Sequence, residues 1–232
     1  MSMAKAFILV KKEQIGENML RLELSPKDGK PLQFKPAQFV NLGLMDKGKM
    51  VKRPYSIASP PDSKNLEFCI KIVGGEFTSL LPPLKTGTEF SVDGPFGPAF
   101  YDEKKDFVLI AGGVGIVPMM SILRYRARRK GGQVILFYSA ANIKRMPYFE
   151  ELRAFSQLPG IKIFFSLSRE VCEGWPFHCG RFEHKDFLAN LPSPAKFSYF
   201  ACGKKEMVDE MREILLSLGA KPELSHFEGW GV

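Results

Sequence analysis

The feature that most constrains the fold is an apolar segment that runs directly into three glycines and a proline. Residues 107–111 read Phe-Val-Leu-Ile-Ala, which is typical of a strand buried on both faces of a parallel sheet. Gly112, Gly113 and Gly115 follow, and their lack of a Cβ atom lets the backbone approach a ligand closely. Pro118 suits the first turn of a helix, where its missing N–H would have no partner anyway. We expect a strand, a glycine turn and a helix, in that order.

Such a turn directs unpaired backbone N–H groups and the positive end of a helix dipole toward one place. An anion such as a phosphate is the ligand that this arrangement favours. The spacing Gly113-x-Gly115-x-x-Pro118 is only part of the usual dinucleotide fingerprint, so a tight turn without a ligand stays an alternative.

The chain changes its pattern near residue 104. Before that point, residues 20–24 and 66–72 alternate between apolar and polar side chains, and turns rich in proline, glycine and aspartate separate such segments. After it, strands are expected at 107–111, 134–138, 161–167 and 197–202, and helices at 118–129, 147–156 and 204–218. We predict two domains: an N-terminal antiparallel β-barrel over residues 1–103, and an α/β nucleotide-binding domain with a parallel sheet over residues 104–232.

The distribution of apolar residues indicates the compartment. No apolar run approaches the ~20 residues that a membrane-spanning helix needs. The N-terminus leads straight into a strand-like segment, without the apolar stretch of a signal peptide. We therefore expect a cytoplasmic protein without a membrane span.

The formal net charge of +8 raises the question of a nucleic-acid partner. The basic residues are scattered, however, apart from one cluster made of Arg124, Arg126, Arg128, Arg129 and Lys130. This cluster lies in the last turns of the helix predicted after the glycine turn, where cations favour the helix dipole. We expect a solvated helix end and no nucleic-acid partner. Docking of an acidic protein, or attraction of a phosphate-bearing cofactor, is the alternative.

The four cysteines are expected to be reduced thiols, because a cytoplasmic setting keeps thiols reduced. Cys172, His178, Cys179 and His184 are close in sequence, but their spacing matches no usual zinc site. The chain also has no close set of cysteines of the kind that holds an iron–sulfur cluster. The sequence therefore predicts no metal.

Two segments of the first domain carry residues that suit a nucleotide cofactor. Arg53, Tyr55 and Ser56 could bind a phosphate, stack on a flat ring and donate to the edge of that ring. A surface strand with a half-buried tyrosine is the alternative. Gly75 leads to Thr78 and a short apolar run, which predicts a second helix N-terminus suited to a phosphate, with a plain capped turn as the alternative.

Together and in this order, the motifs make the chain resemble the ferredoxin–NADP reductase family of flavoproteins over nearly its whole length. Five matches carry the resemblance: the flavin motif Arg53-Pro54-Tyr55-Ser56, the pyrophosphate segment Gly75-Glu76-Phe77-Thr78, the nicotinamide-dinucleotide loop from Gly113 to Pro118, Cys202-Gly203 followed by Met207, and Glu228-Gly229-Trp230. Lys204 departs from the family, which usually has proline after the cysteine and glycine.

The resemblance implies a flavin site in the first domain. Arg53 would pair with a flavin phosphate, and Tyr55 would lie against one face of the isoalloxazine. Ser56 would hydrogen-bond near the nitrogen that accepts the hydride, which makes Tyr55 and Ser56 catalytic as well as binding residues. Thr78 and the backbone around Gly75 would bind the pyrophosphate.

The resemblance also implies a pyridine-nucleotide site in the second domain, whose binding residues are Gly113, Gly115, Pro118, Cys202 and Gly203. Cys202 would pack beside the reacting carbon of the nicotinamide without acting as a nucleophile; a buried cysteine at a strand end is the alternative. Glu228 and Trp230 are further catalytic candidates. Trp230 would cover the other face of the flavin and move aside for the nicotinamide, or else be a loosely packed anchor of the tail.

The function that the resemblance implies is a reductase with FAD that oxidises NADPH or NADH. Hydride transfer needs the donor carbon and the acceptor nitrogen about 3–3.5 Å apart, so two domains that each hold one cofactor suffice. We expect the electrons to pass to a separate acidic carrier such as a ferredoxin, because no iron–sulfur segment flanks the two domains.

Several alternatives stay open at this point. The acceptor could be a small molecule such as free flavin or a quinone, or the chain could be a non-catalytic electron-transfer subunit. FMN could replace FAD, and the oligomeric state is not determined. Lys144 and Arg145 could supply charge for the 2′-phosphate of NADPH, although no acidic residue follows the second strand to bind a ribose hydroxyl.

Overall fold

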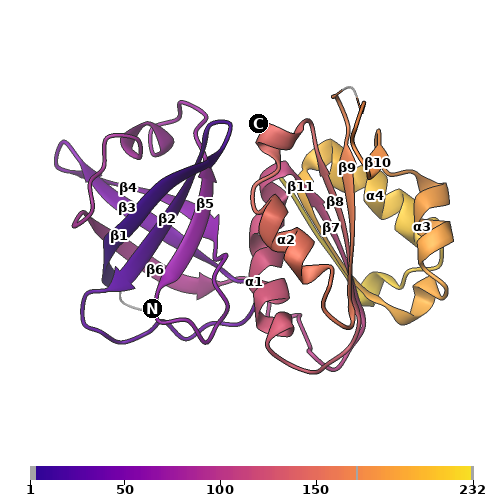
Figure 1. Ribbon diagram of the computed structural model, residues 1–232. Coiled ribbons are helices and arrows are strands. Elements are labelled where there is room, and N and C mark those ends of the chain that lie inside the picture. The colour runs from indigo at the N-terminus through magenta and orange to yellow at the C-terminus, as the bar shows by residue number, and fades with distance from the viewer. Residues whose placement is uncertain (1–3, 171, 231–232) are drawn as a thin grey trace. The chain divides into compact units, whose positions relative to one another are not determined.

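The computed structural model describes residues 4–170 and 172–230. Contacts between residues divide the chain into two compact units. The barrel unit comprises the chain up to Tyr101 together with Val117–Tyr125. The α/β unit comprises Asp102–Ile116 and the chain from Arg126 onward. Each unit is described below by itself (Figure 1).

The barrel unit is built on a six-stranded antiparallel sheet with the strand order β4-β3-β6-β1-β2-β5. The strands are β1 (Lys5–Gly16), β2 (Met19–Pro26), β3 (Phe39–Asp46), β4 (Lys49–Ser56), β5 (Leu66–Lys71) and β6 (Glu89–Phe96). Just after β4, the N–H of Ala58 donates to the carbonyl of Glu67 in β5, at 2.8 Å, which links the two ends of the sheet. The predicted antiparallel barrel is confirmed.

The barrel core comes from the alternation seen in the sequence. Leu22 of β2 is paired with Phe68 of β5, and Leu24 with Leu66. All four side chains are fully buried. The polar residues between them are only partly buried on β2 and β5, as expected for strands with one face in a core.

The α/β unit contains a six-stranded parallel sheet with the order β10-β9-β8-β7-β11-β12. Its strands are β7 (Phe107–Gly112), β8 (Val134–Ala140), β9 (Ile161–Leu167), β10 (His178–Cys179), β11 (Ser198–Lys204) and β12 (Ser225–Trp230). The order reverses at β7, because β8 and β9 lie on one side of it and β11 and β12 on the other. The carboxyl ends of β7 and β11 therefore form the switch point, where open α/β sheets bind their ligands.

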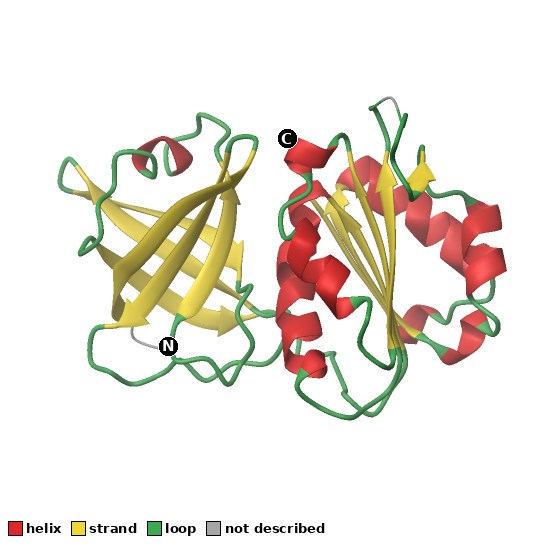
Figure 2. Ribbon diagram, in the orientation of Figure 1, coloured by secondary structure: helices red, strands yellow, loops and turns green. Residues whose placement is uncertain are grey.

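Helices lie on both faces of this sheet (Figure 2). Phe187 of α3 (His184–Asn190) and Met211 of α4 (Lys205–Ser217) share a core with Phe137 of β8. On the other face, Phe149 of α2 (Phe149–Phe155) contacts the ring of Phe165 of β9 at 5.0 Å. This arrangement confirms the predicted α/β domain. Within the described residues, no helix combines the length and the apolar character needed to cross a bilayer.

Helix α1 (Ile116–Ala127) follows the glycine turn, whose last residues form the short 3-10 helix η2 (Gly113–Gly115). The helix begins two residues earlier than predicted, and Pro118 lies in its first turn. Residues 117–125 belong to the barrel unit through direct contacts. The Ser121 hydroxyl donates to the carbonyl of Ser59 at 2.8 Å, and Arg124 donates to the carbonyl of Ala58 at 3.1 Å.

The expectation that the basic cluster is a solvated helix end is wrong for two of its arginines. The side chain of Arg124 is only 11% exposed and pairs with Glu67 of β5 at 2.9 Å. Arg126 is 7% exposed, and its guanidinium donates to the carbonyls of Gly132 at 2.9 Å, Gly131 at 3.1 Å and Arg129. The guanidinium of an arginine has five N–H donors in a rigid, planar arrangement, so it can bind several backbone carbonyls of one turn. The charge pattern of the sequence does not reveal such a role.

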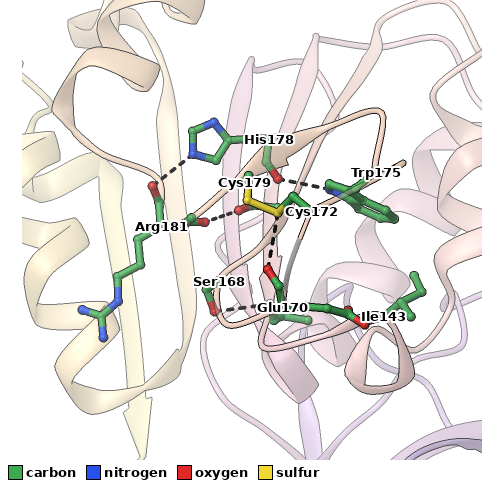
Figure 3. Close-up of a disulfide and its surroundings, with 11 residues drawn as sticks. Ile143, Ser168, Glu170, Cys172, Trp175, His178, Cys179 and Arg181 are labelled. Atoms are coloured by element: carbon green, nitrogen blue, oxygen red, sulfur yellow. Dashed lines mark hydrogen bonds between the residues drawn. A yellow bond between two sulfur atoms is a disulfide. The ribbon is translucent and has the colours of Figure 1, made fainter.

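The expectation of four reduced cysteines is also wrong. Cys172, in the loop after β9, forms a disulfide with Cys179 of β10, and their Cα atoms are 6.0 Å apart (Figure 3). The indole N–H of Trp175, in the same loop as Cys172, donates to the carbonyl of His178 of β10 at 3.1 Å. Cys69 and Cys202 are free and buried. Sequence reasoning took the redox state from the compartment, which says nothing about the cysteines that a loop brings together.

Candidate functional site

The end of β4 carries the arginine that sequence analysis assigned to a flavin phosphate. The Arg53 side chain is half exposed, and its Nη2 lies 3.1 Å from Oε2 of Glu76. The other carboxylate oxygen of Glu76 lies 3.5 Å from Nζ of Lys49. Exposed ion pairs of this kind contribute little free energy, so a phosphate can compete with Glu76 for the guanidinium. The arginine is accessible and already oriented by a negative group.

Tyr55 connects the two flavin motifs. Its ring lies 5.3 Å from the ring of Phe77, which belongs to the segment from Gly75 to Thr78. Burial raises the pKa of the Tyr55 hydroxyl to about 12, against the opposing charge of Arg53. The phenol is therefore neutral and available as a hydrogen-bond donor at physiological pH. Pro54 is exposed, and Ser56 is partly buried at the last position of β4.

The helix expected after Gly75 is a single 3-10 turn, η1 (Thr78–Leu80). The Thr78 hydroxyl closes the preceding loop, because it donates to the carbonyl of Gly75 at 3.3 Å and accepts from the N–H of Val73 at 3.4 Å. A Cβ on Gly75 would meet nothing closer than the Thr78 hydroxyl, at 3.9 Å. The backbone at Gly75 is thus open to a ligand, which fits a pyrophosphate.

The glycine turn after β7 needs its glycines for different reasons. A Cβ on Gly115 would lie 2.0 Å from the carbonyl oxygen of Cys202, so only glycine lets the turn approach β11. Gly113 has a φ of +54°, and the space around its Cα is open. Its carbonyl accepts from the hydroxyl of Tyr138, at 3.2 Å. Tyr138, on β8, is a supporting residue that sequence analysis did not find.

Cys202 and Glu228 are brought together by the pairing of the last two strands. The two residues are in register in the parallel pair β11–β12. The Cys202 Sγ lies 3.9 Å from Oε2 of Glu228, and the cysteine is fully buried. The pKa of the Cys202 thiol is raised well above its ordinary value. The largest cause is burial, and the charge and the hydrogen bond of Glu228 add to it. The sulfur therefore stays a neutral donor and not a nucleophilic thiolate.

Gly203 completes this packing, since a Cβ on it would lie 2.8 Å from Cε of Met207. Trp230 is in register with Lys204 at the end of β12, and its side chain is 37% exposed. It therefore belongs to a paired strand and not to a loose tail. Lys204, where the family usually has proline, is the last residue of β11 and the N-cap of α4.

His226 is a second residue that sequence analysis missed. Its Nε2 lies 2.9 Å from Oε1 of Glu228. The signal that could have found it is the spacing of two residues between His226 and Glu228, which places both side chains on one face of a strand. The strand itself, β12, was not predicted.

The structure thus brings the candidate residues together in two groups. In the barrel unit, the group consists of Arg53, Tyr55, Ser56, Gly75 and Thr78. In the α/β unit, the group consists of Gly113, Gly115, Cys202, Gly203 and Glu228.

Comparison with known proteins assigns both units. The profile of the oxidoreductase FAD-binding domain matches residues 6–101, and that of the oxidoreductase NAD-binding domain matches residues 109–213. The chain belongs to the ferredoxin–NADP reductase family of flavoprotein oxidoreductases. It has the FAD-binding and the NAD-binding domain of that family, in this order.

Two curated relatives give the scale of the sequence similarity. The chain is 33% identical to sulfhydrogenase 1 subunit gamma of Pyrococcus furiosus, and the similarity covers 82% of the present chain. It is 29% identical to the flavohemoprotein of Bacillus subtilis, and that similarity covers 98% of the present chain. The chain spans 66% and 59% of the length of these two relatives.

Solved structures share the fold at low sequence identity. The FAD/NAD-binding domain of nitric oxide dioxygenase from Vibrio cholerae superposes with a TM-score of 0.88 at 23% identity, over 100% of both chains. A ferredoxin NADP+ reductase from Neisseria gonorrhoeae, with bound FAD and NADP, gives a TM-score of 0.82 at 20% identity, over 99% of this chain and 100% of that one.

Proposed function

We propose that the chain is a reductase that takes a hydride from NADH or NADPH onto FAD and passes the electrons to a separate acidic iron–sulfur protein of the ferredoxin type. The observation that carries this proposal is the contact of the buried Cys202 thiol with the partly exposed Glu228, beside the glycine turn, in a chain that also has an FAD-binding domain. In this proposal, residues 1–103 bind the flavin and residues 104–232 bind the pyridine nucleotide.

The flavin residues act by binding and orientation. Arg53 exchanges Glu76 for a phosphate of the cofactor, and the open backbone at Gly75 with the Thr78 hydroxyl receives the pyrophosphate. Tyr55 stacks on one face of the ring system, and Ser56 donates to the edge of that ring. When bound, FAD supplies a ring nitrogen that accepts two electrons as a hydride, and it can release them one at a time.

The nucleotide residues act by shape and by uncharged contact. Gly115 and Gly203 let the glycine turn and β11 approach each other, and the open Gly113 gives the backbone access to a phosphate. The Cys202 thiol keeps its proton because of the raised pKa, so it packs against the nicotinamide without attacking it. In this proposal, Glu228 holds that thiol in place, and Trp230 has the role that the family resemblance implies, which is to cover the other face of the flavin.

The net charge of +8 supports an acidic acceptor. The names of relatives also support an acceptor protein. They include the ferredoxin reductase component of 3-ketosteroid-9-alpha-monooxygenase from Rhodococcus rhodochrous and the toluate 1,2-dioxygenase electron transfer component from Pseudomonas putida. Each of these is at most 27% identical to the chain.

A second candidate is an electron-transfer subunit of a larger complex. The relatives that favour it are named as subunits: sulfhydrogenase 1 subunit gamma, and one subunit of the Na(+)-translocating NADH-quinone reductase of Methylococcus capsulatus. In that case the chain would still bind flavin, but its electrons would go to a stably bound partner.

The test is an anaerobic titration of the FAD-loaded protein with NADH and, separately, with NADPH, followed by visible absorption. We expect one nucleotide to bleach the flavin and the reduced protein to pass electrons to a purified acidic [2Fe–2S] ferredoxin. Reduction of a soluble quinone but not of the ferredoxin would favour the small acceptor. A flavin that neither nucleotide bleaches would favour the subunit, and a protein that retains neither FAD nor FMN would overturn the proposal.

A further inference from the structure

The edge strand of the parallel sheet carries a histidine, His226, that has no role in the proposed function. His226 and Glu228 are two residues apart on β12, so their side chains leave the strand on the same face. Phe200 and Cys202 of β11 are in register with them. Phe227, between the two, points to the other face and packs against the core that includes α4. The other four side chains therefore form one group on the face away from α4.

Both oxygens of the Glu228 carboxylate are engaged in this group. Oε1 lies 2.9 Å from Nε2 of His226, and Oε2 lies 3.9 Å from Sγ of Cys202. A carboxylate only accepts hydrogen bonds, so the thiol and Nε2 each carry the hydrogen they share with it. The carboxylate is thus held from two sides, by a neutral thiol and by an imidazole N–H.

The imidazole is itself restrained by a rigid neighbour. Its ring centre lies 5.4 Å from that of Phe200, with the two rings inclined at 39°. Phe200 is fully buried on β11, the strand between β7 and β12. A glutamate side chain has three rotatable bonds, and the second contact removes freedom that the thiol alone would leave. His226 thereby fixes the carboxylate relative to the middle of the sheet.

We propose that His226 is the positioning residue of the Cys202–Glu228 pair: it holds one oxygen of Glu228 so that the other faces the Cys202 thiol. This inference rests on the proposed function, in which Cys202 and Glu228 lie at the nicotinamide. His226 acts through Glu228. Hydride transfer depends steeply on the placement of the groups around the reacting atoms, so a loosened Glu228 slows the transfer more than it weakens nucleotide binding.

The first test is spectroscopic and needs no cofactor. The S–H stretch of a cysteine moves to lower frequency when the thiol donates a hydrogen bond, and infrared difference spectra of Cys202→Ala assign the band of this residue. A Cys69→Ala background removes the other free thiol. We expect the band of Cys202 to rise in frequency in His226→Phe, because its acceptor is no longer held, and to stay near its original position in His226→Gln, whose amide keeps a donor near the place of Nε2.

His184→Phe is the matched control, because His184 is an exposed histidine at the first residue of α3. It should leave the Cys202 band unchanged. His226→Ala repeats the comparison without a new aromatic ring, in case the phenylalanine variant does not fold. A Cys202 band that stays unchanged in both His226→Phe and His226→Ala would overturn the proposal.

The second test uses the FAD-loaded protein in a rapid-mixing experiment. We expect His226→Phe to lower the limiting rate of flavin reduction about tenfold while the nucleotide concentration at half-maximal rate changes less than about twofold. His226→Gln should recover most of the rate. Equal losses in the Phe and Gln variants, or a loss confined to nucleotide binding, would contradict a positioning role.

The two tests separate this inference from the proposed function. If neither nucleotide reduces the flavin of the wild-type protein, the proposed function fails, while the infrared result still decides whether His226 holds the pair. If the wild-type flavin is reduced but His226→Phe and wild type have the same rate, only the inference about His226 fails.

Discussion

Gly115 lies so close to Cys202 that a single methyl group would not fit between them. The Cβ of an alanine at position 115 would be 2.0 Å from the carbonyl oxygen of Cys202. The obstacle is backbone and not a side chain that could rotate away, so the turn or the strand would have to move. This contact joins the glycine turn, which we propose faces the phosphates of the nucleotide, to the strand that carries the candidate catalytic cysteine.

Gly115→Ala should therefore lower the free energy of unfolding by about 2–3 kcal/mol, as overpacking against fixed backbone does. Urea denaturation of the cofactor-free protein measures the change. Gly75→Ala is the matched control, since its Cβ would meet only the Thr78 hydroxyl at 3.9 Å, and it should change stability little. Equal stability of the Gly115 variant and wild type would mean that the turn is not packed as described.

Arg53→Ala should weaken FAD binding by about tenfold, because the cofactor phosphate loses a charge-assisted hydrogen bond from a partly exposed group. Equilibrium titration of the cofactor-free protein with FAD, followed by flavin fluorescence, gives the dissociation constant. Lys52→Ala removes the adjacent exposed cation and should leave the constant nearly unchanged. Similar constants for wild type and Arg53→Ala would remove this residue from the flavin site.

Arg126→Ala should destabilise the α/β unit by about 2–4 kcal/mol, because the carbonyls of three turn residues lose a buried charged donor. Thermal unfolding followed by circular dichroism would report the loss. Lys130→Ala, an exposed cation of the same cluster, should have little effect. If the two variants unfolded at the same temperature, Arg126 would be another solvated residue.

Denatured but unreduced protein should react with two equivalents of iodoacetamide, because only Cys69 and Cys202 are free. After reduction the number should rise to four, as counted by mass spectrometry. In the chain-entropy account, a disulfide between residues seven positions apart adds about 2–3 kcal/mol to the free energy of unfolding. The double variant Cys172→Ser, Cys179→Ser should lose about that amount of stability. Four labelled cysteines before reduction would contradict the disulfide.

Stability should fall in alkaline solution because buried acids keep their protons in the folded state. Burial raises the pKa of Cys69 from 9.0 to about 12. The unfolded chain releases this proton near pH 9 and the folded chain does not, so the stabilisation is complete below pH 9 and is lost as the pH rises toward 12. Between about pH 9 and 11, the free energy of unfolding of Cys69→Ala should therefore fall by about 1–2 kcal/mol less than that of the wild type. Urea denaturation at each pH measures this difference.

Short-range patterns were enough to predict most of the fold. The strand predicted at 161–167 matches β9 residue for residue, and the apolar run before the glycines is β7. The alternation at 20–24 and 66–72 gave β2 and β5, although not the fact that these two strands pair. Periodicity records which face of an element is buried, and such information lies within a few residues of the chain.

The features that were missed depend on contacts between distant residues. Helix α3 and strand β12 were not predicted, because α3 is only seven residues long and β12 is a half-exposed edge strand. The burial of Arg126 depends on carbonyls in the turn after its helix, and the role of His226 depends on the register between β11 and β12. Charge in the sequence does not encode the partners of Arg126, and the spacing of His226 and Glu228 does not reveal that Cys202 lies beside them.

The candidate site followed a similar division. We selected the motif residues Arg53, Tyr55 and Thr78 because their types and order suit a phosphate and a flat ring. Their present partners were not found, since Glu76 and Phe77 had no expected role beyond filling the motif. A motif indicates the class of ligand. The side chains that the motif residues contact when no ligand is bound depend instead on how the chain packs.

The contacts of α1 have a consequence for any recombination of modules between relatives. A chimera made by replacing the first 103 residues would exchange the barrel strands but keep the native α1, with Ser121 and Arg124. These two side chains are fitted to the carbonyls of Ser59 and Ala58 and to the carboxylate of Glu67. A transplanted barrel would be compatible only if it presented acceptors at the same three places, so the helix has to be chosen with the barrel and not with the sheet that precedes it in the chain.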